Sequence, residues 1–301
     1  MTGLVGFPRC FAAPPFPAAS LLPPARLLPA RLLTAHLLAA VLLLAAGLGV
    51  PMRSATAAGC MPEVASRPSG RSLFIPASFI ADAPEQVSIT FLGHASFLIE
   101  SPQHVTAVTD YNGYNIPADP PDIATMNHAH STHYTNNPDP RIKYVLHGWS
   151  ETAEPAHIDL TYRDMHVGNL PTNIRDRARG GTEINGNSIF LFQTAGLCIA
   201  HLSHLHHLLT AEDLAALGQI DIVMAPVDGE WTMSHADMAA VLDQLHAPLV
   251  IPMHYFNRSV LEPFLALVRD RYTIRLSEER DVVISRATLP AQPEILVLPG
   301  G

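Results

Sequence analysis

DIATMNHAHSTH, residues Asp122–His133, contains the most informative pattern in this sequence, a short apolar run that passes directly into three histidines. The same order recurs at Leu197–His207 (LCIAHLSHLHH) and at Leu249–His254 (LVIPMH). The apolar part of each run is typical of a buried strand, because it is short, continuous and bounded by polar residues. Each predicted strand therefore delivers imidazole groups at its carboxyl end.

These three strand ends predict a metal site. The carboxyl ends of strands in α/β sheets are where ligands bind, so the histidines are expected to share one site. Neutral imidazole is the commonest metal ligand, and zinc takes three or four such donors. We predict His128, His130, His133, His204 and His254 as metal ligands. His128 and His130 are expected to reach one ion, because residues i and i+2 face the same way in extended backbone.

Other segments indicate a family. ITFLGHASFLIES (Ile89–Ser101), the strand that ends in NHAHSTH, IDIVMAPVDGEWTMSHADMAAVLDQL (Ile220–Leu245) and LVIPMHY occur in the order seen in metallo-β-lactamase-fold hydrolases. Over about Val87–Val268 the chain resembles the branch with ascorbate-6-phosphate lactonase-like and N-acyl-phosphatidylethanolamine phospholipase D-like proteins. The resemblance implies an α/β fold, a four-layer αββα sandwich in a single domain, with a usually dinuclear metal site between its sheets. It also implies a hydrolase whose metal-bound hydroxide attacks an ester, lactone, amide or phosphodiester bond.

The family motif H-x-H-x-D-H falls on His128, His130, Thr132 and His133, so threonine replaces the acid. The family's last histidine corresponds to His254. The bridging aspartate of the family falls at Ser203-His204, where His204 takes the place of an acid. A further family histidine is expected near residues 172–174, where this sequence has none.

Two more residues are implied by the resemblance alone. Asp110 matches an aspartate that the family uses near the metal but not on it, and His94 is a candidate for the pocket. The predicted catalytic residues are therefore His128, His130, Asp110 and His94.

The predicted ligand set contains only nitrogen. All-imidazole ligation favours Zn²⁺, with Mn²⁺ and Fe²⁺ as alternatives, and one or two ions are expected. His133, His204 and His254 can form a three-histidine zinc pocket with an open position, while His128 and His130 bind a second ion or the substrate. The alternative function is a non-catalytic metal- or ligand-binding protein that keeps the fold. Because the change to His204 supplies another good ligand, the sequence favours an enzyme with an altered site.

Apolar and alternating runs predict the remaining elements. Helices are expected at Thr210–Leu217, Ser234–His246 and Ser259–Arg269, with Thr210 and Ser234 as N-caps. Residues 175–187 are predicted to form a loop, because Gly180-Gly181 and Asn185-Gly186 are turn signals. Further strands are expected at Val87–Leu92, Ser96–Glu100, Val105–Asp110, Ile142–Leu146, Ile158–Tyr162, Met165–Leu170, Ser188–Gln193 and Ile220–Val227.

The N-terminal region is typical of a secretory signal peptide. Arginines precede the apolar run Leu32–Val50, and the small-residue stretch Ser54–Ala58 follows it. We predict that residues 1–58 are a cleaved signal, residues 59–76 a flexible lead and residues 77–301 the hydrolase domain, in a protein exported to the periplasm or secreted. A retained membrane anchor and a lipid on Cys60 are alternatives. In an oxidising compartment Cys60 can instead pair with Cys198.

Charge excludes some partners. The chain beyond residue 59 holds 14 basic and 27 acidic residues, which disfavours nucleic acid and anionic membrane surfaces. No GxGxxG, P-loop or GxSxG motif occurs, so nucleotide-binding and serine-hydrolase classes have no support. The expected partner is a small-molecule substrate, with no membrane contact beyond a signal or lipid anchor.

Overall fold

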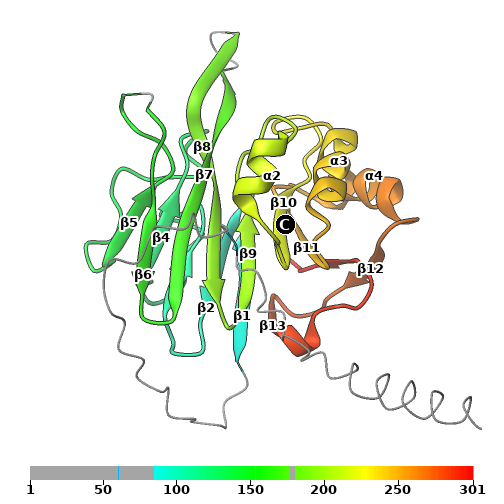
Figure 1. The fold of residues 1–301 in the computed structure, drawn as a ribbon, viewed down its shortest axis with the longest axis horizontal. Helices are drawn as coiled ribbons and strands as arrows, with labels where there is room; N and C mark the ends of the chain where they lie inside the picture. Colours follow the sequence, from blue (N-terminus) through cyan, green and yellow to red (C-terminus); the bar gives the residue numbers. More distant parts are fainter. Residues whose placement is uncertain (1–59, 61–84, 153, 177–179, 301) are drawn as a thin grey trace, which may run out of the picture. The chain divides into compact units, whose positions relative to one another are not determined.

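The computed structural model describes residues 60, 85–152, 154–176 and 180–300, which form two mixed β-sheets and three α-helices (Figure 1). The six-stranded sheet has the order β13 (Asp281–Ser285), β1 (Gln86–Gly93), β2 (Ser96–Glu100), β3 (Thr106–Val108), β4 (Ile123–Met126), β5 (Tyr144–His147). The eight-stranded sheet has the order β12 (Thr273–Leu276), β14 (Glu294–Val297), β11 (Leu249–Met253), β10 (Ile222–Pro226), β9 (Leu197–His201), β8 (Gly181–Thr194), β7 (Met165–Asp176), β6 (Asp159–Tyr162). The helices are α2 (Ala211–Leu217), α3 (His235–Leu245) and α4 (Arg258–Val268), and a 3₁₀ turn follows at Arg286–Thr288.

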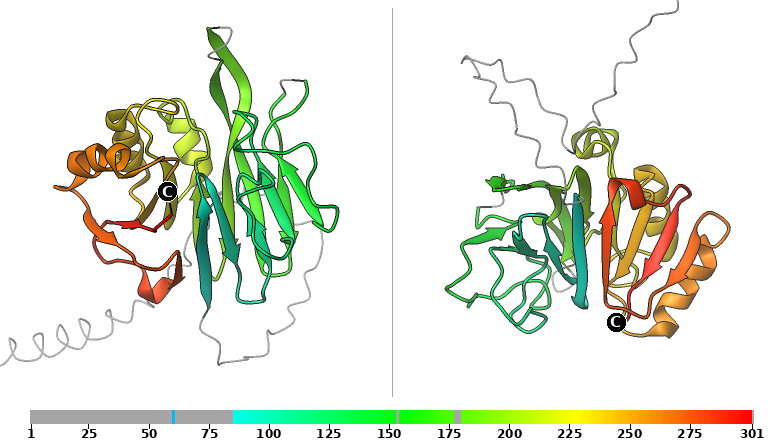
Figure 2. Two further views of the ribbon diagram at one scale, coloured as in Figure 1. Left: turned by 180° about the vertical axis from the view of Figure 1, so that it is seen from behind. Right: turned by 90° about the horizontal axis from the view of Figure 1, so that it is seen from below.

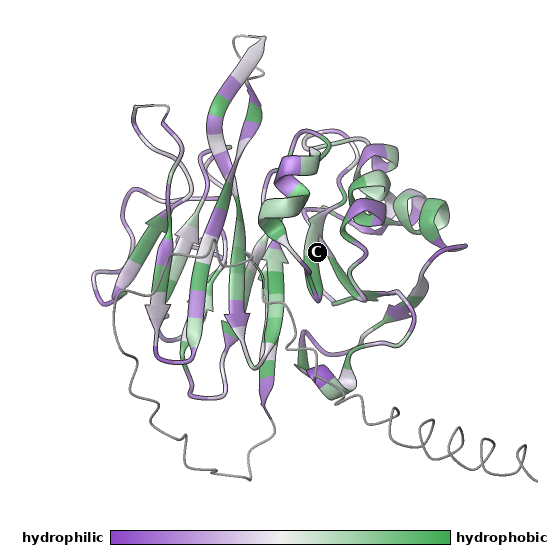
Figure 3. Ribbon diagram, viewed as in Figure 1, coloured by the Kyte–Doolittle hydropathy of each residue, from purple (hydrophilic) through white to green (hydrophobic). Residues whose placement is uncertain are grey.

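The two sheets pack face to face through alternate residues of their strands. Ile89 and Phe91 of β1 lie in the same buried cluster as Phe190 and Phe192 of β8. The intervening residues of β8 point the other way, because side chains alternate across a strand. Strands β9, β10 and β11 are buried along their whole length and are mostly hydrophobic (Figure 3). Both faces of the central strands are therefore covered.

The helices lie on the outer face of the eight-stranded sheet (Figures 1 and 2). Leu242 of α3 and Phe264 of α4 pack in one cluster with Val223 of β10 and Val250 of β11. On the outer face of the six-stranded sheet the described residues form loops, and Tyr111 and Ile142 of these loops pack against β3 and β4. The sandwich predicted from the resemblance is confirmed, with loops in the position of the helical layer on that side.

Most predicted elements are present. The strands Ile123–Met126, Leu197–His201 and Leu249–Met253 lie in the three runs where the sequence predicts strands that end at histidines. Thr210 caps α2 with a reciprocal capping box to Asp213, and Ser234 caps α3. The strands β12, β13 and β14 had no counterpart in the sequence prediction.

The loop predicted at residues 175–187 is wrong at residues 175–176 and 181–187, while residues 177–179 lie outside the described residues. Strand β7 reaches Asp176 and β8 begins at Gly181, so the two strands form a ribbon that extends beyond the rest of the sheet (Figure 1). Asn185 and Gly186 lie inside β8, where the register shifts between Thr172 and Ile174 of the partner strand. Gly and Asn in such a strand indicate a bulge and not a turn. Cross-strand pairing outweighs the local turn propensity.

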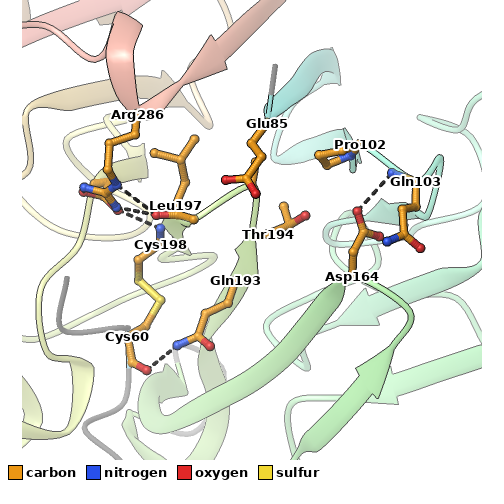
Figure 4. A pocket seen from close by; sticks show the side chains of 13 residues that line it. Cys60, Glu85, Pro102, Gln103, Asp164, Gln193, Thr194, Leu197, Cys198 and Arg286 are labelled. Carbon is orange, nitrogen blue, oxygen red and sulfur yellow. Dashed lines mark hydrogen bonds and ion pairs between the residues drawn. A yellow bond between two sulfur atoms is a disulfide. The ribbon is translucent and has the colours of Figure 1, made fainter. Parts of the chain in front are cut away.

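A disulfide joins Cys60 to Cys198, the second residue of β9 (Figure 4). Gln193 donates a hydrogen bond to the carbonyl oxygen of Cys60, and a hollow of about 490 Å³ lies beside the pair. A sulfur atom in a disulfide cannot also carry a lipid, so the structure favours pairing of Cys60 over its lipidation. Apart from Cys60, the predicted signal and lead lie outside the described residues, among which no helix is long and apolar enough to cross a membrane.

Candidate metal centre

Four histidines converge at the edge where the carboxyl ends of the central strands meet. His130 and His133 follow β4, His204 follows β9, and His254 follows β11. Their candidate ligand atoms all lie within 4.8 Å of one another. The Nε2 atoms of His130 and His204 are 2.9 Å apart, and those of His133 and His254 are 3.3 Å apart. The structure therefore brings together four of the five predicted ligands.

In each of these rings Nδ1 lies on the side away from the cluster, and we call it the outer nitrogen. In three of the rings it contacts an oxygen atom. His133 Nδ1 lies 2.6 Å from Asp110, His254 Nδ1 lies 3.0 Å from Asp228, and His130 Nδ1 lies 2.7 Å from the Thr132 hydroxyl. A carboxylate oxygen can only accept, so Nδ1 of His133 and His254 carries the hydrogen and Nε2 carries a lone pair. Two such lone pairs face each other inside the cluster. This donor set fits a cation. A metal-bound histidine usually donates its other ring N–H to a carboxylate or a similar acceptor, as His133 and His254 do here.

Burial keeps these rings neutral. Desolvation, together with the neighbouring histidines, lowers the pKa of His130, His133 and His204 from the ordinary value. The charged form loses its hydration in such a site, whereas the neutral form keeps a free lone pair. These three rings are therefore held in the form that binds metal at neutral pH.

Asp110 lies behind His133 and is completely buried. Its carboxylate accepts hydrogen bonds from the Ser203 hydroxyl at 2.7 and 2.9 Å and from the Asn127 amide at 3.3 Å. Burial raises the pKa of Asp110, and the hydrogen bonds from Ser203 and Asn127 oppose this effect. The residue positions the ring of His133 and does not belong to the group of candidate ligands.

Asp228 is a site residue that the sequence did not reveal. It follows β10 and accepts hydrogen bonds from the backbone N–H of Glu230, Trp231 and Thr232 and from the Thr232 hydroxyl. Burial alone would raise the pKa of Asp228, but its hydrogen bonds to His254 and Thr232 outweigh burial and hold the pKa below its usual range. The sequence signal is an acid directly after a buried strand, but the Asp-Gly pair resembles an ordinary turn.

The backbone of the site is unusually strained. His94, Asp110, Ser203 and His254 all have φ between 43° and 57°, in the left-handed region. This region is uncommon for residues other than glycine, and such residues cluster at functional sites. The backbone N–H of His254 donates to the carbonyl oxygen of His94 at 2.7 Å, which ties two of these residues together.

His94 lies in the turn between β1 and β2, next to the cluster. Its ring centroid is 4.2 Å from that of His254 and 5.3 Å from that of His133. Burial and the neighbouring His254 and His130 lower the pKa of His94 to about 3. Its Nε2 is buried without a hydrogen-bond partner among the described residues. A neutral ring with an unused polar atom thus borders the metal centre.

The structure does not bring His128 to the cluster. Its Nδ1 lies 2.7 Å from the Glu183 carboxylate of β8, and its ring stacks on Trp149. The backbone after Met126 leaves the strand and turns, so the alternation expected for His128 and His130 does not apply there. His128 instead anchors the loop after β4 to the β7–β8 ribbon, and its N–H donates to the Gly186 carbonyl.

Other histidines of the second cluster surround His204. The Nε2 of His206 lies 2.5 Å from His204 Nδ1, while His207 Nε2 accepts the backbone N–H of Asn173. His201 is fully buried, and its Nε2 lies 2.8 Å from the Ala95 carbonyl oxygen. None of the three belongs to the group of candidate ligands.

A sandwich of two mixed sheets with a histidine cluster at the carboxyl ends of its strands defines the class as the metallo-β-lactamase fold. The model of the beta-lactamase superfamily domain matches residues 88–254, which is more than half of the chain. The chain belongs to this superfamily.

Relatives share the fold over most of their length. The UPF0173 metal-dependent hydrolase of Methanosphaerula palustris is 23% identical over 188 residues, which cover 58% of this chain and 86% of the relative. That of Desulforamulus reducens is 26% identical over 199 residues, covering 56% and 84%. The crystal structure of a proposed zinc-dependent hydrolase of the metallo-β-lactamase superfamily from Thermotoga maritima is 25% identical, has a TM-score of 0.51, and covers 70% of this chain and 98% of that one. These matches establish the superfamily and not the branch that the sequence resembles.

Proposed function

We propose that this protein is a zinc-dependent hydrolase that cleaves an ester, lactone, amide or phosphodiester bond in a small-molecule substrate. The coarser class, a metal-dependent hydrolase of the metallo-β-lactamase superfamily, agrees with the family match and with the names of the relatives. The observation that carries the proposal is the convergence of four imidazoles, three of them buried and one half-buried, each with its outer nitrogen within 3.0 Å of a second group.

The choice of zinc rests on the ligand atoms. The cluster offers imidazole nitrogen and no carboxylate, and nitrogen donors suit zinc better than magnesium or calcium. A bridging carboxylate is absent from this group, since Thr132 and His204 stand at the two acidic positions of the family pattern. We therefore propose one zinc ion per chain, with Mn²⁺ and Fe²⁺ as the alternatives.

The protein's own residues orient the reaction. Asp110 and Asp228 fix the rings of His133 and His254, so that both present Nε2 to the same point. His94 borders that point with a buried Nε2 that can form a hydrogen bond to water or substrate. When bound, the ion supplies Lewis acidity, which activates water and polarises the bond to be cleaved.

We also propose that the mature protein works outside the cytoplasm, in the periplasm or as a secreted protein. The signal-like segment supports this location, and so does the Cys60–Cys198 disulfide, since disulfides persist mainly in oxidising compartments. N-terminal sequencing of the native protein tests it: a terminus between Ala58 and Cys60 is expected, and an intact Met1 in a cytosolic fraction contradicts export.

One experiment tests the activity. The protein is loaded with Zn²⁺, its zinc content is measured by elemental analysis, and it is assayed on lactones, carboxylic esters, acyl amides and phosphodiesters with and without a chelator. We expect about one zinc per chain and chelator-sensitive cleavage of one bond class. Zinc binding with no cleavage in any class would favour the alternative, a binding protein that keeps the fold. Absence of zinc binding would contradict the proposed zinc-dependent hydrolase.

A further inference from the structure

Exposed aromatic rings of the described residues all follow the carboxyl ends of strands, as the candidate ligands do. The exposed large hydrophobic side chains in this part of the chain include three aromatic rings, Tyr114, Trp231 and Phe256, which are 48–59% exposed. Tyr114 follows β3, Trp231 follows β10 and Phe256 follows β11. The described loops at the amino ends of the strands carry no exposed aromatic ring. Single exposed apolar side chains are normal on a protein surface, but a group of them at one site marks a place where a ligand binds.

Phe256 lies directly against the candidate metal centre. Its ring centroid is 5.7 Å from that of His94 and 6.1 Å from that of His254. Phe256 belongs to none of the three buried hydrophobic clusters, so its ring does not serve the core. A ring that contacts the site and is 56% exposed is available to a ligand that is bound there.

Hydrogen bonds tie the loops of Tyr114 and Trp231 to the same site. Asn112 Nδ2 donates to the Thr132 carbonyl oxygen at 2.9 Å, and Asn112 Oδ1 accepts the backbone N–H of Tyr114 at 3.1 Å. The backbone N–H of Trp231 donates to the carboxylate of Asp228, which holds one of the candidate ligands. Both loops are therefore fixed next to the histidine cluster.

We propose that Phe256, together with Tyr114 and Trp231, forms an apolar rim that binds a hydrocarbon part of the substrate, an alkyl chain or an aryl ring, beside the bond that is cleaved. The inference rests on the proposed function and narrows it to substrates that carry such an apolar group. A hydrocarbon group and the rim are removed from water together, which favours binding, whereas a hydroxyl-rich or charged group gains nothing from the rings. Phe256 is expected to contribute most, because its ring contacts two rings of the site.

Two zinc-binding compounds that differ only in chain length test the rim without turnover. Acetohydroxamate and octanohydroxamate carry the same metal-binding group, and isothermal titration calorimetry measures their affinities for the zinc-loaded protein. We expect octanohydroxamate to bind at least about tenfold more tightly, because each methylene group that leaves water against the rim adds affinity. Similar affinities for the two compounds would overturn the inference.

Variants assign this preference to Phe256. We expect Phe256→Ala to reduce the ratio of the two affinities by about three- to tenfold, and Phe256→Leu, which keeps an apolar side chain, to reduce it less. Leu267→Ala is the matched control, because it removes an exposed apolar side chain from helix α4 and should keep the wild-type ratio. Elemental analysis of each protein shows whether zinc is still bound. A wild-type ratio in Phe256→Ala would show that this ring does not contact the chain, and would overturn the inference.

Failure of the rim and failure of the proposed function give different results. If the wild-type protein binds no zinc, the proposed function fails and the inference fails with it. If zinc and both hydroxamates bind but chain length has no effect, only the apolar rim is wrong.

Discussion

The two ends of strand β9 hold distant parts of the chain together in different ways. At the amino end, Cys198 forms a covalent bond to Cys60, 138 residues away in sequence. At the carboxyl end, His204 meets histidines from both sheets through weak contacts between neutral rings. The amino end is thus held without any ligand, whereas the carboxyl end contains nitrogen atoms that could hold a metal ion. Stability and chemistry are separated along one strand.

The largest effect is expected from His133→Ala, at the carboxyl end. The change removes a ring that is fully buried and held by Asp110, and it leaves that buried carboxylate with one hydrogen-bond partner fewer. We expect zinc content to fall to a small fraction of one per chain, and thermal stability in the presence of zinc to fall with it, because metal binding adds to folding free energy. His104→Ala, which alters an exposed histidine, is the control. Equal zinc content in the two variants would contradict the assignment.

The carboxyl end was predictable from sequence only in part. Apolar strands that run into histidine identified His130, His133, His204 and His254, because the carboxyl ends of adjacent strands meet at one edge. The exclusion of His128 was not predictable, since it depends on the turn after Met126 and on Glu183 in a distant strand.

A smaller effect is expected at the amino end. Cys198→Ser removes the disulfide and should lower the free energy of unfolding by about 2–4 kcal/mol, because the unfolded chain is then less constrained. Zinc content should stay as in wild type, since Cys198 lies at the opposite end of β9 from His204. Denaturant unfolding and elemental analysis measure the two quantities. Cys60→Ser is the matched control and should have the same effect, and two free thiols in unreduced wild type would contradict the bridge.

Where local sequence signals agree with the tertiary structure, the fold was more predictable than the site. The capping box of Thr210 and Asp213 fixed the start of α2, and the apolar run Leu249–Met253 fixed β11. The β7–β8 ribbon was missed because glycine and asparagine within it are turn residues elsewhere. The strand β13 was missed because it pairs with β1, as Thr90 does with Asp281, across a long stretch of sequence that no local pattern spans.

Acid is expected to lower the stability of the metal-free protein through the buried histidines around the carboxyl end of β9, and not through the disulfide at its amino end. Burial lowers the pKa of His133 and His201, so below the ordinary value of 6.5 the unfolded chain binds protons that the folded chain does not. Stability is therefore complete above pH 6.5 and is lost as the pH falls, by at most about 1.4 kcal/mol per pH unit for each such histidine. We expect a lower melting temperature for metal-free protein at pH 5.5 than at pH 7.5. An unchanged melting temperature would show that these rings do not remain neutral.

The smallest effect is expected for Asp228→Asn. This change alters only how the candidate ligand His254 is oriented, so it tests the carboxyl end of the comparison without removing a ligand. The amide keeps an oxygen for the N–H groups of Glu230 and Thr232, so the loop after β10 should remain folded. The change removes the negative charge that lies 3.0 Å from His254 Nδ1. That charge orients the ring and makes its Nε2 a better electron-pair donor to a metal. Loss of such an outer partner typically costs 10–100-fold in metal affinity, and we expect a decrease of about that size in a competition assay with a zinc chelator. The melting temperature of the metal-free protein should change little. A large fall in metal-free stability with zinc affinity unchanged would mean that Asp228 serves the loop and not the metal centre.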